Sequence, residues 1–550
     1  MKERLKGEPP FIIYPDLSFA DLRATVISQF DDGQQFGQKV LHRALRAADW
    51  YRPREERGPA AWAAMAKLEE QLENRAYAIA QDLSSSEWLW YMRRVEWLFT
   101  AIPVPPPMVP NPSYTMAIAE SVSALSAAAT KGSSTPIPRT TYPTGRDAAA
   151  SVLRMHAVSV LLANTQATLR WAAKGAAVRA IGGLIQIQSA PELDARVNLW
   201  DQRMRDDNDD FLGRAGLYTH LLGSVPDPSL QFAEVAILVK SDHGYQFSLL
   251  RLAEIPALLD SSLPADLRWP TSLLDLIALL WAPILGWLKK GLQETADIQR
   301  CGYWVTTRDL VLGELGSAVE AIGALRLRGA IPEEVRFGRP EEIFNRLAFS
   351  EVCLWPPSMG PVIRTGEEGW VIVDFEAATQ ALRQALSKPH LEGEDDTAWS
   401  THFEKSIQAA LNASPWKPST KIRDLRGRHL AAGRATITDI DAVGESGKRL
   451  LVVSCKSRPF SDAWNRGDND AVRNVASNVD EAVAQWADRT AKLREARHGD
   501  NYDFSAYEEI IGVVVFPTVP WTPTETSVAE VLPGLRVAVS AGEFGKWVSK

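Results

Sequence analysis

The residues best placed to do chemistry lie in the stretch ATITDIDAVGESGKRLLVVSCKS, residues 435–457. Side chains in a strand alternate between its two faces, so Asp439 and Asp441 are predicted to share one face of a first strand. The glycine-containing turn GESG leads into a second strand, on which Ser454 and Lys456 share a face. The sequence therefore predicts a hairpin that presents two carboxylates beside a hydroxyl and an ammonium group.

Carboxylates beside a lysine suit metal-dependent hydrolysis of a phosphodiester. Mg²⁺ and Mn²⁺ prefer oxygen ligands, commonly one or two carboxylates together with waters and substrate phosphate. Such an ion polarises the phosphoryl oxygen and lowers the pKa of its bound water. A neighbouring lysine can orient that water or stabilise charge that develops at phosphorus. The alternative is a surface hairpin whose Asp439, Asp441 and Lys456 form solvated ion pairs, each worth about 0–1 kcal/mol.

The elements that must position this hairpin resemble those of the PD-(D/E)xK superfamily of restriction-endonuclease-like nucleases. Its members have a helix with a glutamate, a strand with a metal-binding aspartate, and a hairpin to a strand ending in an acid, any residue and lysine. A further helix follows. Here residues 401–411 match the leading helix, with Glu404 in the acidic position, residues 470–496 match the following helix, and residues 510–517 match a later core strand. The resemblance covers residues 397–550.

The resemblance implies a role for each matching side chain. Asp441 would bind a Mg²⁺ or Mn²⁺ ion with Asp439 as a supporting acid, and Lys456 would serve the attacking water. The sequence departs from the family at Ser454, which stands where members have Asp or Glu and which is a poor metal ligand. A carboxylate from elsewhere in the chain could take that place, and the candidates are Glu404 and Glu481.

A basic stretch separates the leading helix from the hairpin. Residues 417–434 contain six Lys and Arg residues and His429, against one acid, Asp424. Contacts between such residues and phosphates supply affinity for nucleic acid without reading its sequence. We therefore predict nucleic-acid contacts, with DNA favoured, at Lys421, Arg423, Arg426, Arg428 and Arg434. A solvated basic loop is the alternative.

The remaining sequence predicts a mainly α-helical protein of several domains. We expect a helical N-terminal region over residues 1–101 and a Pro/Ser/Ala-rich linker over 102–146, because the prolines of IPVPPPMVPNPS exclude a helix. A mixed, mostly helical central domain is expected over 147–396. The acidic, turn-rich segment LEGEDDT then marks the boundary to a C-terminal α/β domain with a central mixed sheet over 397–550.

Within the central domain, apolar residues at helical spacing predict helices over 146–184, 192–222 and 272–330. Short β-hairpins are predicted at 233–252 and between the segments PVIR and WVIVDF, since alternating apolar runs flank turn residues there.

Composition limits the class of protein. The chain has 550 residues, of which 45% are hydrophobic and 23% charged, which is typical of globular proteins. Three cysteines cannot form a disulfide framework, and the first residues lack an apolar signal, so we expect a cytoplasmic protein. The longest apolar run, 276–288, is shorter than the roughly 18–20 residues that a membrane span needs. The net charge of −8 argues against indiscriminate coating of nucleic acid.

The resemblance, together with these patterns, implies a metal-dependent nuclease, with DNA as the favoured substrate. By analogy alone, such a domain behind a large N-terminal region suggests bacterial defence against foreign DNA, with a protein partner bound through the N-terminal region. The alternative, favoured by Ser454, is an inactive nuclease fold that serves as a binding or scaffolding subunit of a larger complex.

Overall fold

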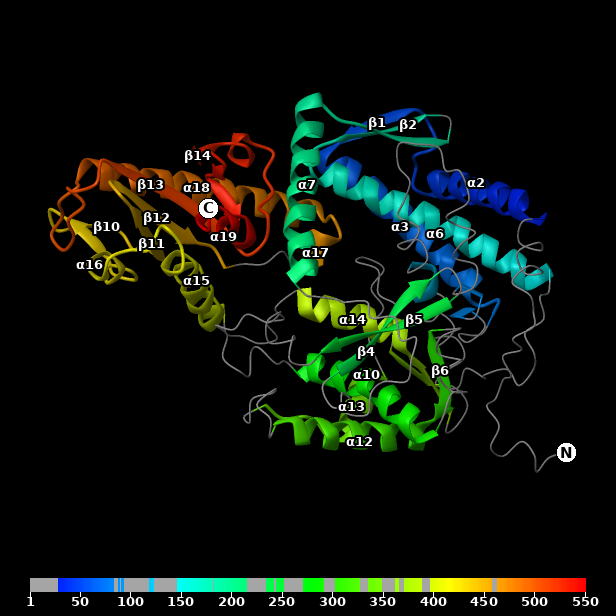
Figure 1. Ribbon diagram of the computed structural model, residues 1–550. Helices are drawn as coiled ribbons and strands as arrows, with labels where there is room; N and C mark the ends of the chain where they lie inside the picture. Colours follow the sequence, from blue (N-terminus) through cyan, green and yellow to red (C-terminus); the bar gives the residue numbers. More distant parts are fainter. Residues whose placement is uncertain are drawn as a thin grey trace.

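In the computed structural model, helices and small sheets form an N-terminal, a central and a C-terminal part of the chain (Figure 1). Helices predominate, and the sheets are small and antiparallel or mixed, as the sequence predicts. The structure describes residues 28–83, 88–89, 91–92, 118–122, 146–181, 183–214, 234–241, 244–251, 271–290, 302–326, 335–348, 362–365, 370–387, 396–457 and 462–550.

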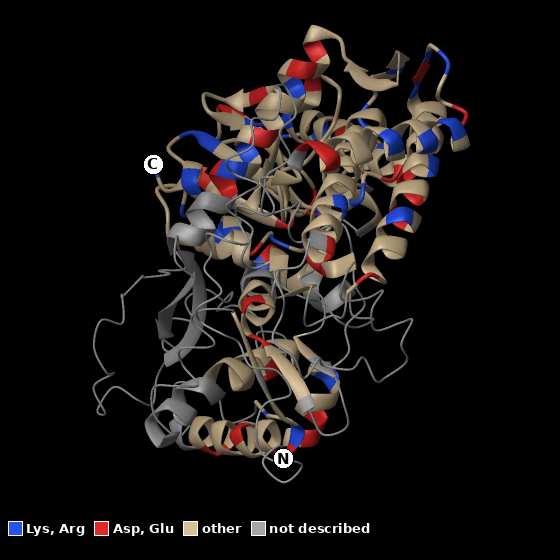
Figure 2. Cartoon of the chain, turned by 90° about the vertical axis from the view of Figure 1, so that its right-hand side faces the viewer, with Lys and Arg blue, Asp and Glu red and all other residues tan. Residues whose placement is uncertain are grey.

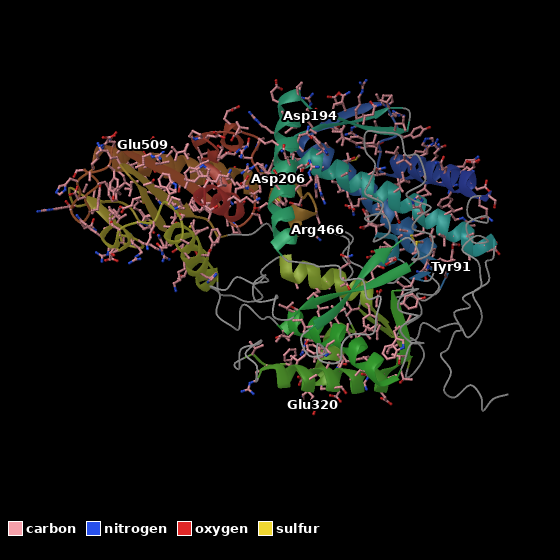
Figure 3. All side chains as sticks on the ribbon, in the orientation of Figure 1. Tyr91, Asp194, Asp206, Glu320, Arg466 and Glu509 are labelled. Carbon is pink, nitrogen blue, oxygen red and sulfur yellow. The ribbon has the colours of Figure 1, made fainter. Side chains whose placement is uncertain are left out.

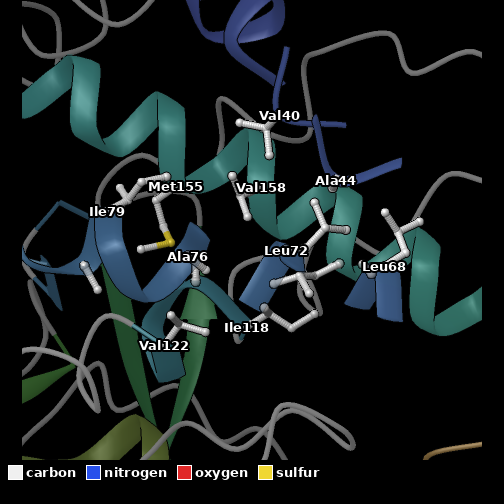
Figure 4. Packing of buried hydrophobic residues seen from close by; sticks show 14 of the residues in the cluster. Val40, Ala44, Leu68, Leu72, Ala76, Ile79, Ile118, Val122, Met155 and Val158 are labelled. Atoms are coloured by element: carbon white, nitrogen blue, oxygen red, sulfur yellow. The ribbon is translucent and has the colours of Figure 1, made fainter. Parts of the chain in front are cut away.

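The N-terminal part is built on three helices, α2 (Phe30–Ala47), α3 (Gly58–Ala80) and α6 (Arg146–Ala173). Buried side chains at helical spacing on α3 pack against buried side chains of α6, as Figure 4 shows. Residues 118–122 are helical and contribute Ile118 and Val122 to the same core. The expected boundary at residue 146 therefore does not divide the core, and the expected linker contains a buried segment; the proline-rich residues 102–113 lie outside the described residues.

Two segments predicted as helix form strands instead. Helix α6 ends before Gly175, whose φ of +105° favours glycine, and the chain continues as β2 (Ala177–Ile181) and β3 (Leu184–Gln188). With β1 (Arg54–Arg57) they make a sheet in the order β1-β2-β3. In the same way β6 (Tyr303–Thr307) interrupts the predicted helix over 272–330, because its aromatic and β-branched residues pair with β8.

The central part contains the helices α10 (Thr271–Lys290), α12 (Arg308–Arg326), α13 (Pro340–Leu347) and α14 (Phe375–Ser387). Both predicted hairpins are confirmed, as β4 (Glu234–Ser241) with β5 (Gly244–Arg251) and β7 (Ile363–Thr365) with β8 (Trp370–Asp374). The apolar run lies in α10, where buried Asp275 forms an ion pair with Arg346. None of the helices that the structure describes is long and apolar enough to cross a membrane.

The C-terminal part has the predicted mixed sheet. Its strands are β11 (Ala442–Ser446), β12 (Arg449–Cys455), β13 (Glu509–Phe516) and β16 (Ala538–Ser540), with β11 antiparallel to β12 and the others parallel. The predicted leading and following helices are present as α15 (Asp396–Asn412) and α18 (Asn469–Glu495). Helix α18 covers one face of the sheet, and α15 with α19 (Ala541–Val548) covers the other. Strand β12 is consequently buried on both faces.

Helix α7 (Pro191–Arg214) lies between the N-terminal helices and the C-terminal part (Figure 1). The ring of Trp200 on this helix meets those of Trp464 and Trp521, with centroids 5.4 and 6.0 Å away. Lys174, just after α6, places its Nζ 3.9 Å from the Trp200 centroid and 4.7 Å from that of Trp521. Arg466, which Figure 3 labels, follows the short helix α17 (Asp462–Asn465). Burial raises the pKa of Glu69 on α3, and the charge of Arg466 opposes this shift. The C-terminal part is therefore packed against elements far away in sequence.

Candidate active site

One amide side chain of helix α15 pairs with the backbone of the edge strand β11. Gln408 Nε2 donates to the carbonyl oxygen of Val443 at 3.0 Å, and the Val443 N–H donates to Gln408 Oε1 at 2.9 Å. The amide thus replaces a neighbouring strand at an edge whose backbone groups would otherwise be buried unpaired. Glu404 lies about one helical turn before Gln408, and Asp441 two residues before Val443. This anchor therefore brings the two carboxylates to the same end of the sheet.

The segment after α15 covers the rest of the β11 edge. The N–H of Glu445 donates to the carbonyl oxygen of Trp416 at 3.0 Å. A Cβ atom on Gly444 would lie 2.8 Å from that oxygen and 2.9 Å from Leu411 Cδ2, so the close approach requires glycine. The turn predicted at 444–447 is instead a tighter one at Gly447, where φ is +60°.

The two aspartates do not lie on one continuous strand, contrary to the prediction. Strand β10 (Ala435–Thr438) pairs with β9 (Leu430–Ala432) in a separate sheet, and residues 439–441 connect β10 to β11. Ile440 is completely buried on the α18 side of the main sheet. Asp439 is exposed and Asp441 is partly buried. Residues 439–441 therefore still alternate between more exposed and buried side chains, although they do not pair as a regular strand.

Asp441 is held in place by strand β12. Its Oδ2 accepts a hydrogen bond from the N–H of Cys455 at 2.6 Å and lies 3.4 Å from Ser454 Oγ. Its own N–H donates to the carbonyl oxygen of Val453 at 3.2 Å. Ser454, which stands at the position expected to be acidic, is only 4% exposed. Its hydroxyl contacts Asp441 and not solvent. The carboxylate therefore has a defined orientation, as a metal ligand requires.

The carboxylates of this cluster repel one another. Burial raises the pKa of Glu404, and the charges of Asp441 and Asp439 raise it further. Burial also raises the pKa of Asp441, with a further contribution from Asp439. The charge of Lys456 opposes both shifts, and its N–H extends the sheet by donating to the Val515 carbonyl at 2.9 Å. Neighbouring carboxylates that disfavour their own ionisation are suited to neutralisation by a bound cation.

Of the two carboxylates proposed to replace the missing acid, Glu404 is the one beside Asp441. Glu481 is exposed on α18 and, with Lys456, lines a pocket of about 660 Å³ at the carboxyl ends of β12 and β13. The charges that act on Glu404 are those of Asp441, Arg426, Asp439 and Lys456. In the described ranges, no three Asp, Glu, His or Cys side chains are already gathered as metal ligands. The donors at the cluster are oxygens, which fit Mg²⁺ or Mn²⁺.

Cys455 is closer to the acidic cluster than the sequence predicts. Its side chain lies in the core beneath α15, with Phe403 and Ile407, as expected for the face opposite Lys456. Burial raises the pKa of its thiol well above the usual value, and the charges of Asp441 and Glu404 raise it further. The neutral thiol is therefore favoured, which agrees with a structural cysteine and not a nucleophile.

The basic stretch is divided between the surface and the site. Lys421 on the short helix α16 (Thr420–Arg423), and Arg428 and Arg434, are exposed, while Arg423 is partly buried. Arg434 lies in the turn between β9 and β10 with φ of +65°, and Asp500 accepts hydrogen bonds from the N–H groups of this turn. Elsewhere Lys and Arg are interspersed with Asp and Glu along the helices (Figure 2). The exposed basic residues therefore form a local feature at the edge of the C-terminal part.

Arg426 points inward, unlike its neighbours in the basic stretch. Its Nε donates to the backbone carbonyl of Asp441 at 2.8 Å, and its charge lowers the pKa of Glu404 against the effect of burial. The sequence missed this contact because a run of cations carries no signal for which member turns inward. It also missed the pairing of Gln408 with Val443, for which a lone glutamine among the apolar positions of the helix was the available sign.

No family model, curated protein or solved structure matches this chain. Function must therefore be inferred from the geometry and charges of the site. The charges of Asp439, Asp441, Arg426 and Lys456 act on Glu404, whereas Glu481 lines the neighbouring pocket, to which Lys456 also belongs.

Proposed function

We propose that the C-terminal part is a metal-dependent nuclease that hydrolyses phosphodiesters, with DNA as the favoured substrate. The observation that supports this most is the carboxylate of Asp441, which the N–H of Cys455 fixes at 2.6 Å where β12 ends, near the charges of Glu404, Asp439 and Lys456. Open α/β sheets commonly bind ligands at the carboxyl ends of parallel strands. Lys456 also lines a pocket of about 660 Å³ at this end of the sheet, which is large enough for part of a nucleotide chain, although Glu404, Asp439 and Asp441 are not among its lining residues.

Each residue of the cluster has a role in this proposal. Asp441 and Glu404 hold a Mg²⁺ or Mn²⁺ ion, and Asp439 supports them by its charge. When bound, the ion polarises the phosphoryl oxygen and acidifies a water molecule. Lys456 orients the attacking water and stabilises negative charge at phosphorus. The exposed Lys421 and Arg428 bind the nucleic-acid backbone, and a role in DNA defence with a protein partner at the N-terminal part belongs to the same proposal.

A second candidate function is that of an inactive scaffold. It is favoured by Ser454, which supplies a buried hydroxyl in place of the second acid of the family. A scaffold has no need to bind Mn²⁺ at Asp441, so metal binding separates the two functions.

The test uses the full chain and compares Asp441→Asn with Asp424→Asn, which neutralises an exposed acid of the basic stretch. We expect Asp441→Asn to lose Mn²⁺ binding and cleavage of DNA while Asp424→Asn retains both. Lys456→Ala should retain Mn²⁺ binding and cleave about 10²–10³-fold more slowly, the usual loss on removing one charge-stabilising donor. If wild type and Asp441→Asn bind Mn²⁺ equally and neither cleaves DNA or RNA, the nuclease proposal is wrong and the scaffold function stands.

A further inference from the structure

We propose that Arg426 is a positioning residue of the catalytic centre, which fixes the backbone at Asp441, and that it does not bind the nucleic-acid backbone. This inference rests on the proposed nuclease function. Its basis is the hydrogen bond from Arg426 Nε to the carbonyl oxygen of Asp441 at 2.8 Å. The next residue repeats the attachment, since the N–H of Gly427 donates to the carbonyl of Ile440 at 2.9 Å.

Together these bonds fix Asp441 from three directions. Its N–H is bound by the Val453 carbonyl, its side chain accepts from the Cys455 N–H, and its carbonyl accepts from Arg426. The first two partners belong to β12, whereas Arg426 belongs to a different segment. Because residues 439–441 are not paired as a regular strand, Arg426 replaces the support that a neighbouring strand would give.

The placement of Arg426 also differs from that of a phosphate-binding residue. It is partly buried and follows the buried Leu425, whereas Arg428, two residues later, is exposed. Arg426 has its Nε committed to Asp441, and its charge acts on Glu404 within the cluster.

Three substitutions of Arg426 separate the effect of its hydrogen bond to Asp441 from the effect of its positive charge. In Arg426→Gln, the amide nitrogen occupies the chain position of the arginine Nε, so the hydrogen bond to Asp441 can form without the positive charge. Arg426→Lys keeps the charge but has a carbon atom at that position. Arg426→Met has neither donor nor charge. A positioning role therefore predicts rescue by glutamine, and a phosphate-binding role predicts rescue by lysine.

The first measurement is kcat and KM for DNA cleavage with Mn²⁺. We expect Arg426→Met and Arg426→Lys to lower kcat by about 10–100-fold, the range for partners that orient metal ligands, with little change in KM. Arg426→Gln should retain most of the wild-type kcat. Activity retained by lysine and lost by glutamine would overturn the inference.

The second measurement is DNA affinity against salt concentration in EDTA, which needs no catalysis. Arg428→Met should reduce the slope of log affinity against log salt by about 0.9, as expected for one lost phosphate contact. Arg426→Met should leave the slope unchanged, and a reduction equal to that of Arg428→Met would overturn the inference. If wild type cleaves neither DNA nor RNA and binds no Mn²⁺, the proposed nuclease function fails and this inference fails with it. Cleavage by wild type with equal activity of all three Arg426 variants rejects the inference alone.

Discussion

Replacing Arg203 with methionine removes the guanidinium that joins α7 to the C-terminal part. Arg203 is only 5% exposed, and its Nε and Nη2 donate to the two carboxylate oxygens of Glu543 at 2.7 and 2.8 Å. It also donates to the carbonyls of Ala538 at 3.1 Å and Ser527 at 3.4 Å. Methionine keeps the apolar stem as far as the position of the arginine Nε. It leaves Glu543 with Arg536, 4.0 Å away, as its remaining cation, and it leaves two buried carbonyls without this donor.

The magnitude follows from these contacts. Removing one partner of a buried ion pair costs about 3–5 kcal/mol, because the other charge remains buried. Glu543 keeps a hydrogen bond from the N–H of Ser540 at 2.9 Å, and 19% of its side chain is exposed. We therefore expect the free energy of unfolding of the C-terminal part to fall by about 3 kcal/mol, near the lower end of that range. The matched control is Arg205→Met, which alters an exposed side chain on the same helix.

The assay is urea unfolding followed by tryptophan fluorescence, since Trp200, three residues before Arg203 on α7, contacts Trp464 and Trp521. Burial alone would raise the pKa of Glu543, but the hydrogen bonds and charge of Arg203 lead the effects that together lower it. The pair therefore stabilises fully above the usual pKa of 4.5 and loses its contribution as pH falls through the lower pKa of the folded state. The difference between wild type and Arg203→Met should shrink below pH 4.5. Equal losses from Arg203→Met and Arg205→Met, or a difference that grows in acid, would refute the reasoning.

Two further predictions concern the site. Gln408→Leu should lower the free energy of unfolding by about 1–3 kcal/mol, because both backbone groups of Val443 lose their partner. Thermal unfolding measures this, and the exposed Gln485→Leu should change it little. Ser454→Glu should lower the melting temperature without metal, because a new carboxylate is forced against Asp441, and Mn²⁺ should restore it. If Mn²⁺ raises the melting temperature of this variant no more than that of wild type, the added carboxylate does not reach the ion.

The sequence predicts the C-terminal elements well because their signals are local. The run LLVV before Ser454 indicates a strand buried on both faces, and β12 is such a strand. The apolar spacing of α18 and the β-branched run of β13 are equally clear over their whole lengths. Strands β2 and β3 could not be predicted because each has only five residues and both follow a long helix. The alternation of apolar residues over so short a segment cannot be distinguished from helical spacing.

The candidate site could be predicted only in part, because some of its contacts depend on how separate segments pack against one another. Asp439, Asp441 and Lys456 lie within one hairpin region, so their proximity follows from short-range pairing. The contact of Arg426 with Asp441 depends on the path of an irregular segment, and the choice of Glu404 over Glu481 depends on how α15 docks. The ion pair of Arg203 with Glu543 spans 340 positions of the sequence, and no local periodicity encodes such a pairing.

The position of α7 has a consequence for synthesis on the ribosome. Arg203 emerges long before β16 and α19, whose Ala538 and Glu543 accept its hydrogen bonds in the finished protein. At roughly 5–20 residues per second, the interval is about 20–70 s. During that time the nascent chain presents an amphipathic helix with an unpaired cation and an indole to the surrounding chaperones. A nonsense mutation that removes only α19 would leave Arg203 permanently without the Glu543 carboxylate, so truncated chains should be recognised for degradation through α7.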